Sequence, residues 1–175
     1  MDIVQLFECP LCMGIPERER EQFIEGFDYS VKSYMKGDVV FRQGDVCRFL
    51  YILLEGEVEA EMTDDSGAML RIETIRASRA LAPAFLFAED NHFPVTATVS
   101  EKADVFIATK ESVFRQMGRY ESFLRNFLSV NANRTFMPRV AITTSAPFRR
   151  VRKYLLTVAR LKPLHSSSTD RRLLF

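Results

Sequence analysis

The sequence predicts a mainly β fold with flanking helices. Apolar and polar residues alternate with a period of two through residues 31–108, and glycines separate these runs at intervals typical of turns between strands. Before and after this region the apolar residues recur with a helical period. Short strands with frequent turns favour an antiparallel sandwich or barrel, and 47% hydrophobic residues in a chain of 175 are typical of a folded protein.

A short helix is predicted at residues 15–26. Pro16 suits the first turn of a helix, and the glutamates that follow it are favourable near a helix N-terminus. Gly26 can end the helix. Its apolar side is expected to consist of Phe23, Ile24 and Phe27.

Short strands are predicted to follow this helix. The candidates are residues 39–41, 49–54, 58–62, 70–74, 95–99 and 105–108. In the strand at 58–62, Val58, Ala60 and Met62 alternate with three glutamates. In the strand at 70–74, Leu70, Ile72 and Thr74 alternate with Arg71 and Glu73. Such alternation predicts half-buried strands with a charged outer face, and Asp65-Ser66-Gly67 predicts the turn between them.

After Lys110 the spacing of apolar residues becomes helical again. A wide apolar stripe predicts a helix over residues 121–137, which Pro138 should end or kink. The stripe can pack against the strands of its own chain or against a second copy, and a polar Asn131 within it could fix the register of such a pair. The stripe residues are Phe123, Leu124, Phe127, Leu128, Val130 and Asn131.

Charge divides the chain into two parts. Residues 1–110 contain 11 basic and 20 acidic residues, whereas residues 111–175 contain 13 basic and 3 acidic residues. This division predicts an acidic globular part and a basic part for which nucleic acid is the first candidate partner. A cluster at the start of a second predicted helix, residues 148–161, consists of Arg149, Arg150, Arg152 and Lys153.

Several classes of protein are excluded by what the sequence lacks. No apolar run approaches the ~20 residues of a membrane span, so we expect no membrane partner. An N-terminus without basic residues argues against a signal peptide, and three cysteines do not form a disulfide framework, so a cytoplasmic location is expected. The chain has no nucleophile elbow, zinc-protease motif, P-loop or dinucleotide fingerprint, so we expect no enzyme.

Three motifs that occur in order carry a family resemblance. They are Lys36-Gly37-Asp38, then Arg42-Gln43-Gly44-Asp45, then Tyr51-Ile52-Leu53-Leu54-Glu55-Gly56-Glu57-Val58. Together they resemble the cyclic-nucleotide-binding β-roll of Crp/Fnr transcription regulators, over about residues 10–160. The resemblance implies a double-stranded β-roll (jelly-roll) sensor domain at residues 1–110, with the glycines at tight turns of positive φ. It also implies a dimerisation helix at residues 111–138, and hence a homodimer that uses the stripe described above.

Residues 80–96, called the cassette segment below, correspond to the family's phosphate-binding cassette. In nucleotide-binding members a Gly-Glu pair opens the cassette, and an Arg followed by Ser or Thr closes it and holds the cyclic phosphate. Here Ala82-Pro83 and Phe93-Pro94 stand at those positions, and Glu89 and Asp90 would repel a phosphate. We therefore expect no binding of cyclic AMP or GMP in the usual mode. The residues expected to line an effector pocket are Ala82, Pro83, Phe85, Phe87, Phe93, Pro94 and Thr96.

The cassette segment also resembles the branch that includes regulators of the hybrid cluster protein. That branch implies an apolar sensor pocket and, for some members, haem as the gas-sensing cofactor, so the expected effector is an unknown small molecule or haem. The phenylalanines of the segment could line such a pocket or form ordinary core. His92 is a candidate axial haem ligand, and its alternative role is that of a solvated loop histidine.

The three cysteines offer a weaker metal signal. A four-cysteine iron–sulfur site cannot form within one chain from Cys9, Cys12 and Cys47, so we expect no metal. Cys9-Pro10-Leu11-Cys12 also resembles the family's N-terminal lead-in, which implies that Cys9 and Leu11 pack on the roll. Cys47 lies next to Arg48 and could be an activated thiol, although a structural role is the commoner one for such a residue.

The resemblance weakens after the stripe. A helix like residues 148–161 opens the family's winged helix-turn-helix, but only 14 residues follow it here. We therefore expect residues 139–175 to be a divergent linker, a short basic helix and a frayed tail, with DNA bound only if a winged-helix domain is supplied. Three interpretations stay open: the sensing and dimerisation region of a regulator, a module that forms mixed dimers with a full-length regulator, or a fragment of a truncated or frame-shifted gene.

Overall fold

The computed structural model describes residues 3–64 and 66–134. The helical elements are η1 (Ile3–Glu8), η2 (Glu17–Glu19), α1 (Arg20–Glu25), η3 (Pro83–Phe85), α2 (Lys110–Arg119) and α3 (Glu121–Arg134). The strands are β1 (Tyr29–Tyr34), β2 (Val39–Phe41), β3 (Phe49–Glu55), β4 (Glu57–Thr63), β5 (Met69–Arg76), β6 (Arg79–Leu81), β7 (Thr96–Val99) and β8 (Ala103–Thr109). Pro138, the helix predicted at 148–161 and its basic cluster (Arg149, Arg150, Arg152 and Lys153) lie outside the described residues.

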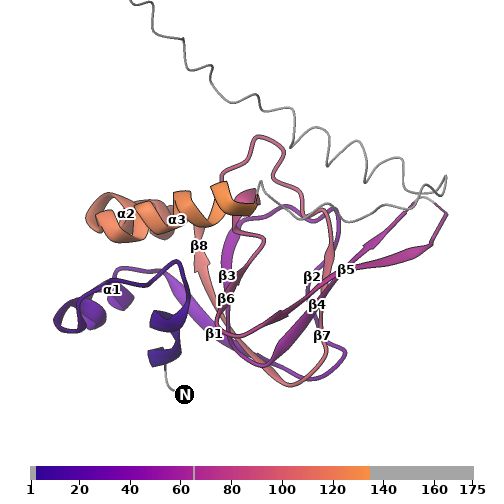
Figure 1. Cartoon of the computed structure of the whole chain (residues 1–175), viewed down its shortest axis with the longest axis horizontal. Helices are drawn as coiled ribbons and strands as arrows, with labels where there is room; N and C mark the ends of the chain where they lie inside the picture. Colours follow the sequence, from indigo (N-terminus) through magenta and orange to yellow (C-terminus); the bar gives the residue numbers. More distant parts are fainter. Residues whose placement is uncertain (1–2, 65, 135–175) are drawn as a thin grey trace, which may run out of the picture.

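The described strands form two antiparallel sheets that face each other as a roll (Figure 1). The first sheet has the strand order β1-β8-β3-β6, and the second has the order β2-β7-β4-β5. The predicted fold class, an antiparallel β-roll with flanking helices, is confirmed, and each predicted strand overlaps an observed one. Strands β1 and β6 were not among the predicted strands.

One predicted alternation is wrong in its second half. Strand β5 contains a bulge, because Ala60 of β4 pairs with Glu73 whereas the following residue, Glu61, pairs with Arg71. Ile72 is therefore an extra residue, and the side-chain alternation shifts after it. As a result Thr74 is exposed and Ile75 is buried, the reverse of the pattern that the sequence predicted.

The outer face of the first sheet is covered by the N-terminal segment and α1. Phe27 of this region meets Phe106 of β8 edge to face, with ring centroids 5.7 Å apart. The predicted helix at 15–26 is present as η2 followed by α1, and it ends at Gly26. The φ of Gly26 is an ordinary −74°, and the residue is small for a different reason. A Cβ at this position would lie 2.5 Å from the side chain of buried Gln116.

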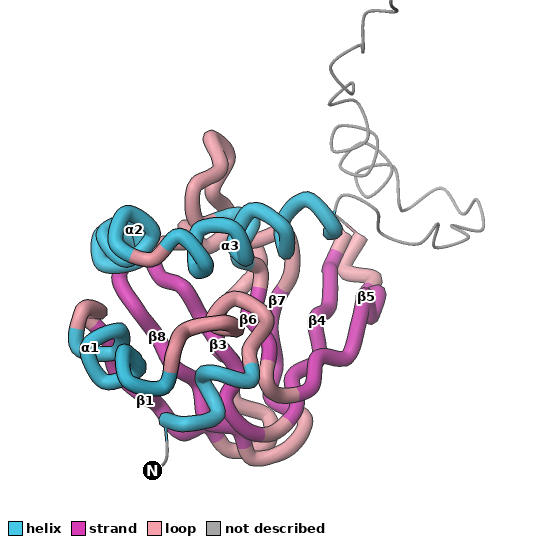
Figure 2. Tube along the Cα trace, turned by 60° about the vertical axis from the view of Figure 1, so that its left-hand side comes forward, coloured by secondary structure: helices cyan, strands magenta, loops and turns pink. Residues whose placement is uncertain are grey.

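The region predicted as one helix after Lys110 contains two helices. Helix α2 ends at Tyr120, whose φ of −122° and ψ of 101° are extended, and α3 starts at the next residue. Both helices lie across one end of the roll (Figure 2). Asn126 ties α3 to the N-terminal segment, since its amide donates to the carbonyls of Leu11 (3.2 Å) and Met13 (2.7 Å). None of the described helices is long and apolar enough to cross a membrane.

Candidate effector site

The cassette segment leaves β6 through a strained residue. Ala82 has a φ of 47°, in the left-handed region that favours glycine, and is followed by the short helix η3. Ala82 and Pro83 are both buried, and Leu86 closes the segment against the core. Phe85 is half-buried at the edge of the core. The opening of the segment is therefore packed by apolar side chains.

Phe93 fills the interior of the roll near the end of the segment. Its ring stacks on that of Phe41, with centroids 3.8 Å apart and an interplanar angle of 12°. The ring of Tyr51 meets it edge to face at 6.0 Å. The backbone of Phe93 is fixed as well, because its N–H donates to the carbonyl of Asp45 (2.9 Å) and its carbonyl accepts from the N–H of Gly44 (2.8 Å). Phe93 thus behaves as core.

Phe87 has different neighbours from Phe93. Its ring contacts Phe114 of α2 (centroids 6.2 Å apart) and Phe127 of α3 (5.7 Å). The ammonium group of Lys110 lies 5.3 Å from the centre of the same ring, within the range of a cation–π contact. The residues predicted to line one pocket are therefore divided between the roll interior and the helices.

Thr96 forms a hydrogen bond with the loop that contains Gln43. Its hydroxyl oxygen accepts a hydrogen bond from the backbone N–H of Gln43 (3.1 Å). The amide of Gln43 in turn pairs with the backbone of Thr63, donating to its carbonyl (2.9 Å) and accepting from its N–H (2.8 Å). Gln43 belongs to the second sequence motif, but its role was not predicted. A glutamine side chain can pair with a peptide group because it carries both a donor and an acceptor. Pro94 is half-buried beside this loop.

This fold and segment agree with a known family. The family described as "Cyclic nucleotide-binding domain" matches residues 31–120, more than half of the chain. The chain belongs to the cyclic nucleotide-binding domain family. A comparison with curated protein sequences yields no match.

Solved structures of transcription regulators share the fold of this cyclic nucleotide-binding domain. A transcriptional regulator from Thermotoga maritima has a TM-score of 0.61 and 23% identity, with 79% of this chain and 96% of that chain covered. The catabolite activator protein of Thermus thermophilus has a TM-score of 0.64 and 19% identity over 86% of this chain and 62% of that one. The sensor domain of the regulator DNR from Pseudomonas aeruginosa has a TM-score of 0.62 and 19% identity over 81% and 97%.

The cassette segment carries acidic side chains and no strongly basic ones. Residues 82–94 of this cyclic nucleotide-binding domain contain no lysine or arginine, and Glu89 and Asp90 are exposed. A hydrogen bond from His92 lowers the pKa of Asp90, so the carboxylate is charged at neutral pH. Pro83 and Pro94 contribute no backbone N–H. The segment thus offers few groups that could hold a phosphate.

The surroundings of His92 do not fit a haem ligand. Its side chain is 54% exposed, and Nδ1 lies 2.9 Å from Oδ1 of Asp90 on the same surface loop. The neighbouring ring of Phe93 occupies the roll interior through its stack with Phe41, where an apolar cofactor would have to enter. Of the two roles predicted for His92, the structure agrees with the solvated loop histidine.

The cysteines are buried thiols in this domain. Cys9 and Leu11 are fully buried, as the resemblance implied. Burial raises the pKa of Cys9 and raises that of Cys12 well above its ordinary value. Since the thiolate is the form that ligates metals and attacks electrophiles, these thiols are poor ligands and poor nucleophiles. Among the described residues there is no group of three or more side chains that could hold a metal ion.

The helix stripe is divided between the core and the surface. Phe123 is fully buried, and its ring packs on Phe23 and Phe27 of the same chain. Phe127 is nearly buried, and its ring contacts Phe87. The two phenylalanines are therefore buried within this chain, and pairing of the stripe with a second copy stays a prediction. Val130 also packs against the core, and Asn131 is half-buried. The exposed part of the stripe consists of Leu124 (37% exposed) and Leu128 (61% exposed).

Tyr51 gives the roll interior a testable dependence on pH. Burial raises its pKa to about 12, and burial raises the pKa of Cys47 to about 11. A tyrosine in an unfolded chain titrates near pH 10, so between pH ~10 and ~12 the unfolded state loses its proton first. Stability conferred by neutral Tyr51 is thus complete below pH ~10 and decreases as the pH rises towards 12.

Replacing Tyr51 should therefore flatten the alkaline loss of stability. We expect the urea midpoint of Tyr51→Phe to decrease less between pH 10 and 11.5 than that of the wild type. Adding Cys47→Ala should flatten the profile further, because Cys47 shares the same sign of shift. Identical slopes for the wild type and Tyr51→Phe would contradict the assignment.

Proposed function

We propose that this domain is the effector-sensing region of a bacterial Crp/Fnr-type transcription regulator that does not respond to cyclic AMP. Its family and the fold it shares with regulator sensor domains support the sensing role. The stacked ring of Phe93 is the main observation against a cyclic nucleotide as the effector. Phe93 stands at the cassette position where the resemblance places a phosphate-binding arginine.

Two physical effects act against a cyclic nucleotide. A phosphate removed from water needs a positive charge or several N–H donors, and the cassette segment supplies neither at Phe93-Pro94. A nucleotide would also have to displace the Phe93 ring from its stack on Phe41, which loses that aromatic contact. The carboxylates of Glu89 and Asp90 add repulsion. An apolar small molecule meets only the second of these barriers.

The route from cassette to helices passes through Phe87. Because this ring contacts both Phe114 and Phe127, a shift of the cassette segment changes the packing of α2 and α3. An effector that binds one arrangement more tightly would raise the population of that arrangement at the expense of the other. We propose that α3 pairs through Leu124 and Leu128, either with a second copy or with a full-length regulator.

Thermal unfolding with cyclic nucleotides tests the proposal. A ligand with a Kd of ~10 µM, present at 1 mM, adds about 2.7 kcal/mol and raises Tm by several degrees. For 1 mM cyclic AMP or cyclic GMP we expect a Tm change no larger than that caused by 5′-AMP. A cyclic-nucleotide-specific rise of several degrees would refute it.

A further inference from the structure

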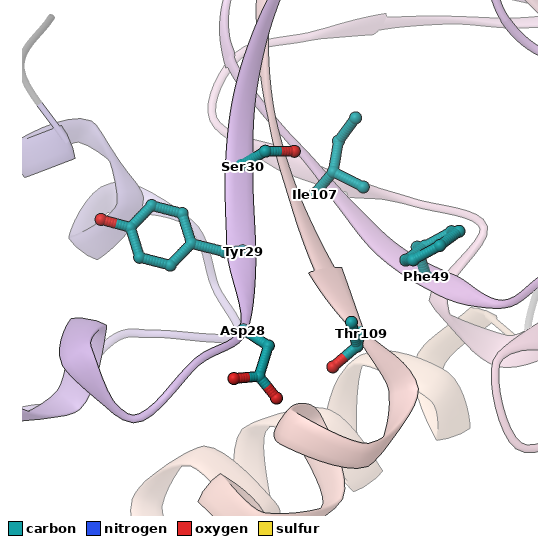
Figure 3. A pocket seen from close by; sticks show the side chains of 6 residues that line it. All are labelled: Asp28, Tyr29, Ser30, Phe49, Ile107 and Thr109. Carbon is teal, nitrogen blue, oxygen red and sulfur yellow. The ribbon is translucent and has the colours of Figure 1, made fainter.

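A hollow lies at the end of the first sheet nearest α2, and the proposed function does not use it. It has a cavity volume of about 370 Å³ and lies where the ends of β1, β3 and β8 meet (Figure 3). The hollow is shallow and largely open to solvent. The residues that line it are Asp28, Tyr29, Ser30, Phe49, Ile107 and Thr109.

The wall of the hollow is apolar. The side chains of Ser30, Phe49 and Ile107 project to the same side of the strands, whereas the ring of Tyr29 points away from them (Figure 3). Phe49 of β3 is 39% exposed, and Ile107 is half-buried. The two side chains thus offer a flat apolar surface that is only partly covered by the chain itself.

The hollow is separate from the cassette segment. Tyr51 is the strand partner of Ile107, and its ring meets Phe49 edge to face at a centroid distance of 6.4 Å. The ring of Phe93 is another neighbour of Tyr51, at 6.0 Å. Since the residues that line the hollow include none from the cassette segment, a ligand here would be distinct from an effector that acts on the cassette.

The rim of the hollow is polar. Oδ2 of Asp28 pairs with the guanidinium of Arg115 at 3.1 Å, which holds the carboxylate at the rim. The other oxygen, Oδ1, can accept a hydrogen bond from a ligand. The hydroxyl oxygen of Thr109 accepts from the N–H of Ser112, and its hydrogen can be donated outward. The carboxylate of Asp28 therefore lies at the rim, on the side of the apolar residues that faces α2 (Figure 3).

We propose that this hollow binds a small aromatic molecule that carries one O–H or N–H donor, the class of phenols and indoles. The ring packs against Phe49 and Ile107, and the donor bonds to Asp28. An aromatic ring fits because partly exposed Phe49 gains an edge-to-face or offset contact that water does not supply. This proposal stands independently of the identity of the cassette effector.

Titration with phenol and anisole, followed by NMR of backbone amides, tests this proposal on the whole chain. We expect phenol to shift the amides of Ser30, Phe49 and Ile107, and to bind at least fivefold more tightly than anisole, which lacks the donor. Phe49→Ala should weaken phenol binding at least fivefold. The control is Met69→Ala, since Met69 is 68% exposed on β5, outside the hollow, and its removal should leave binding unchanged.

Two variants separate the carboxylate from its ion pair. Asp28→Ala should remove the preference for phenol over anisole, whereas Arg115→Met breaks the same ion pair, keeps the carboxylate and should retain that preference. Amide spectra of each variant confirm its fold. Equal affinity of the wild type and Phe49→Ala would overturn the proposal, as would shifts confined to the neighbours of Phe41 and Phe93.

Discussion

Replacing Gly56 by alanine is expected to cost at least ~3 kcal/mol of the free energy of unfolding. Gly56 connects β3 to β4 with a φ of +88°, and this conformation alone costs a residue with a Cβ about 1–2 kcal/mol. The added Cβ would also lie 2.8 Å from Cα of Ala103 and 2.9 Å from the carbonyl carbon of Lys102. These are backbone atoms at the start of β8, so the strand itself would have to move.

Gly67→Ala provides the matched control. Its φ of +83° is similar, but no atom lies within 4 Å of the position that its Cβ would take. We expect a loss of only ~1 kcal/mol, the conformational part. Urea unfolding of both variants measures the difference. Equal losses would show that close approach to β8 has no energetic role.

Phe123→Ala is expected to destabilise the single chain by about 3–5 kcal/mol. Phe123 is fully buried, and its ring lies 5.3 Å from that of Phe23 and 5.8 Å from that of Phe27. Its removal leaves a cavity where α3 meets the N-terminal region. Because all these contacts lie within one chain, the loss in urea unfolding should not depend on protein concentration.

Leu128→Ala separates packing from pairing. Leu128 lies on the same helix and is 61% exposed, so its replacement should change the unfolding free energy of one chain by no more than ~0.5 kcal/mol. Sedimentation of this variant should instead show weaker self-association if α3 pairs through its exposed leucines. A loss for Phe123→Ala that grew with protein concentration would place Phe123 at an interface after all.

The fold was predictable from sequence because period and turn chemistry are local. Two of the six predicted strands followed from alternation and the other four from short apolar runs, and glycines such as Gly56 marked the turns. The bulge at Ile72 was not predictable, since the apolar character of Leu70 and Ile72 continues smoothly across it. The break at Tyr120 was missed for a similar reason, because an aromatic residue fits a helical period whether the backbone is helical or extended.

The directions of the side chains in the cassette segment were not predictable from the sequence. The sequence located the cassette segment and the loss of its phosphate-binding side chains. It could not show that Phe93 faces the roll while Phe87 faces the helices, because direction within an irregular loop has no period. The stripe on α3 likewise left its role open, since a helix that buries one face in its own chain has the same pattern as one that pairs with another.

The bonding of the loop at Gly44 has a consequence for how the cassette segment can move. Its end is joined to this loop by backbone bonds from Gly44, Cys47 and Phe93, and the loop is anchored to β4 through Gln43. That end is therefore a fixed point. Any displacement large enough to reach Phe87 has to be a swing of residues 83–90 about this anchor, with strained Ala82 as the second pivot.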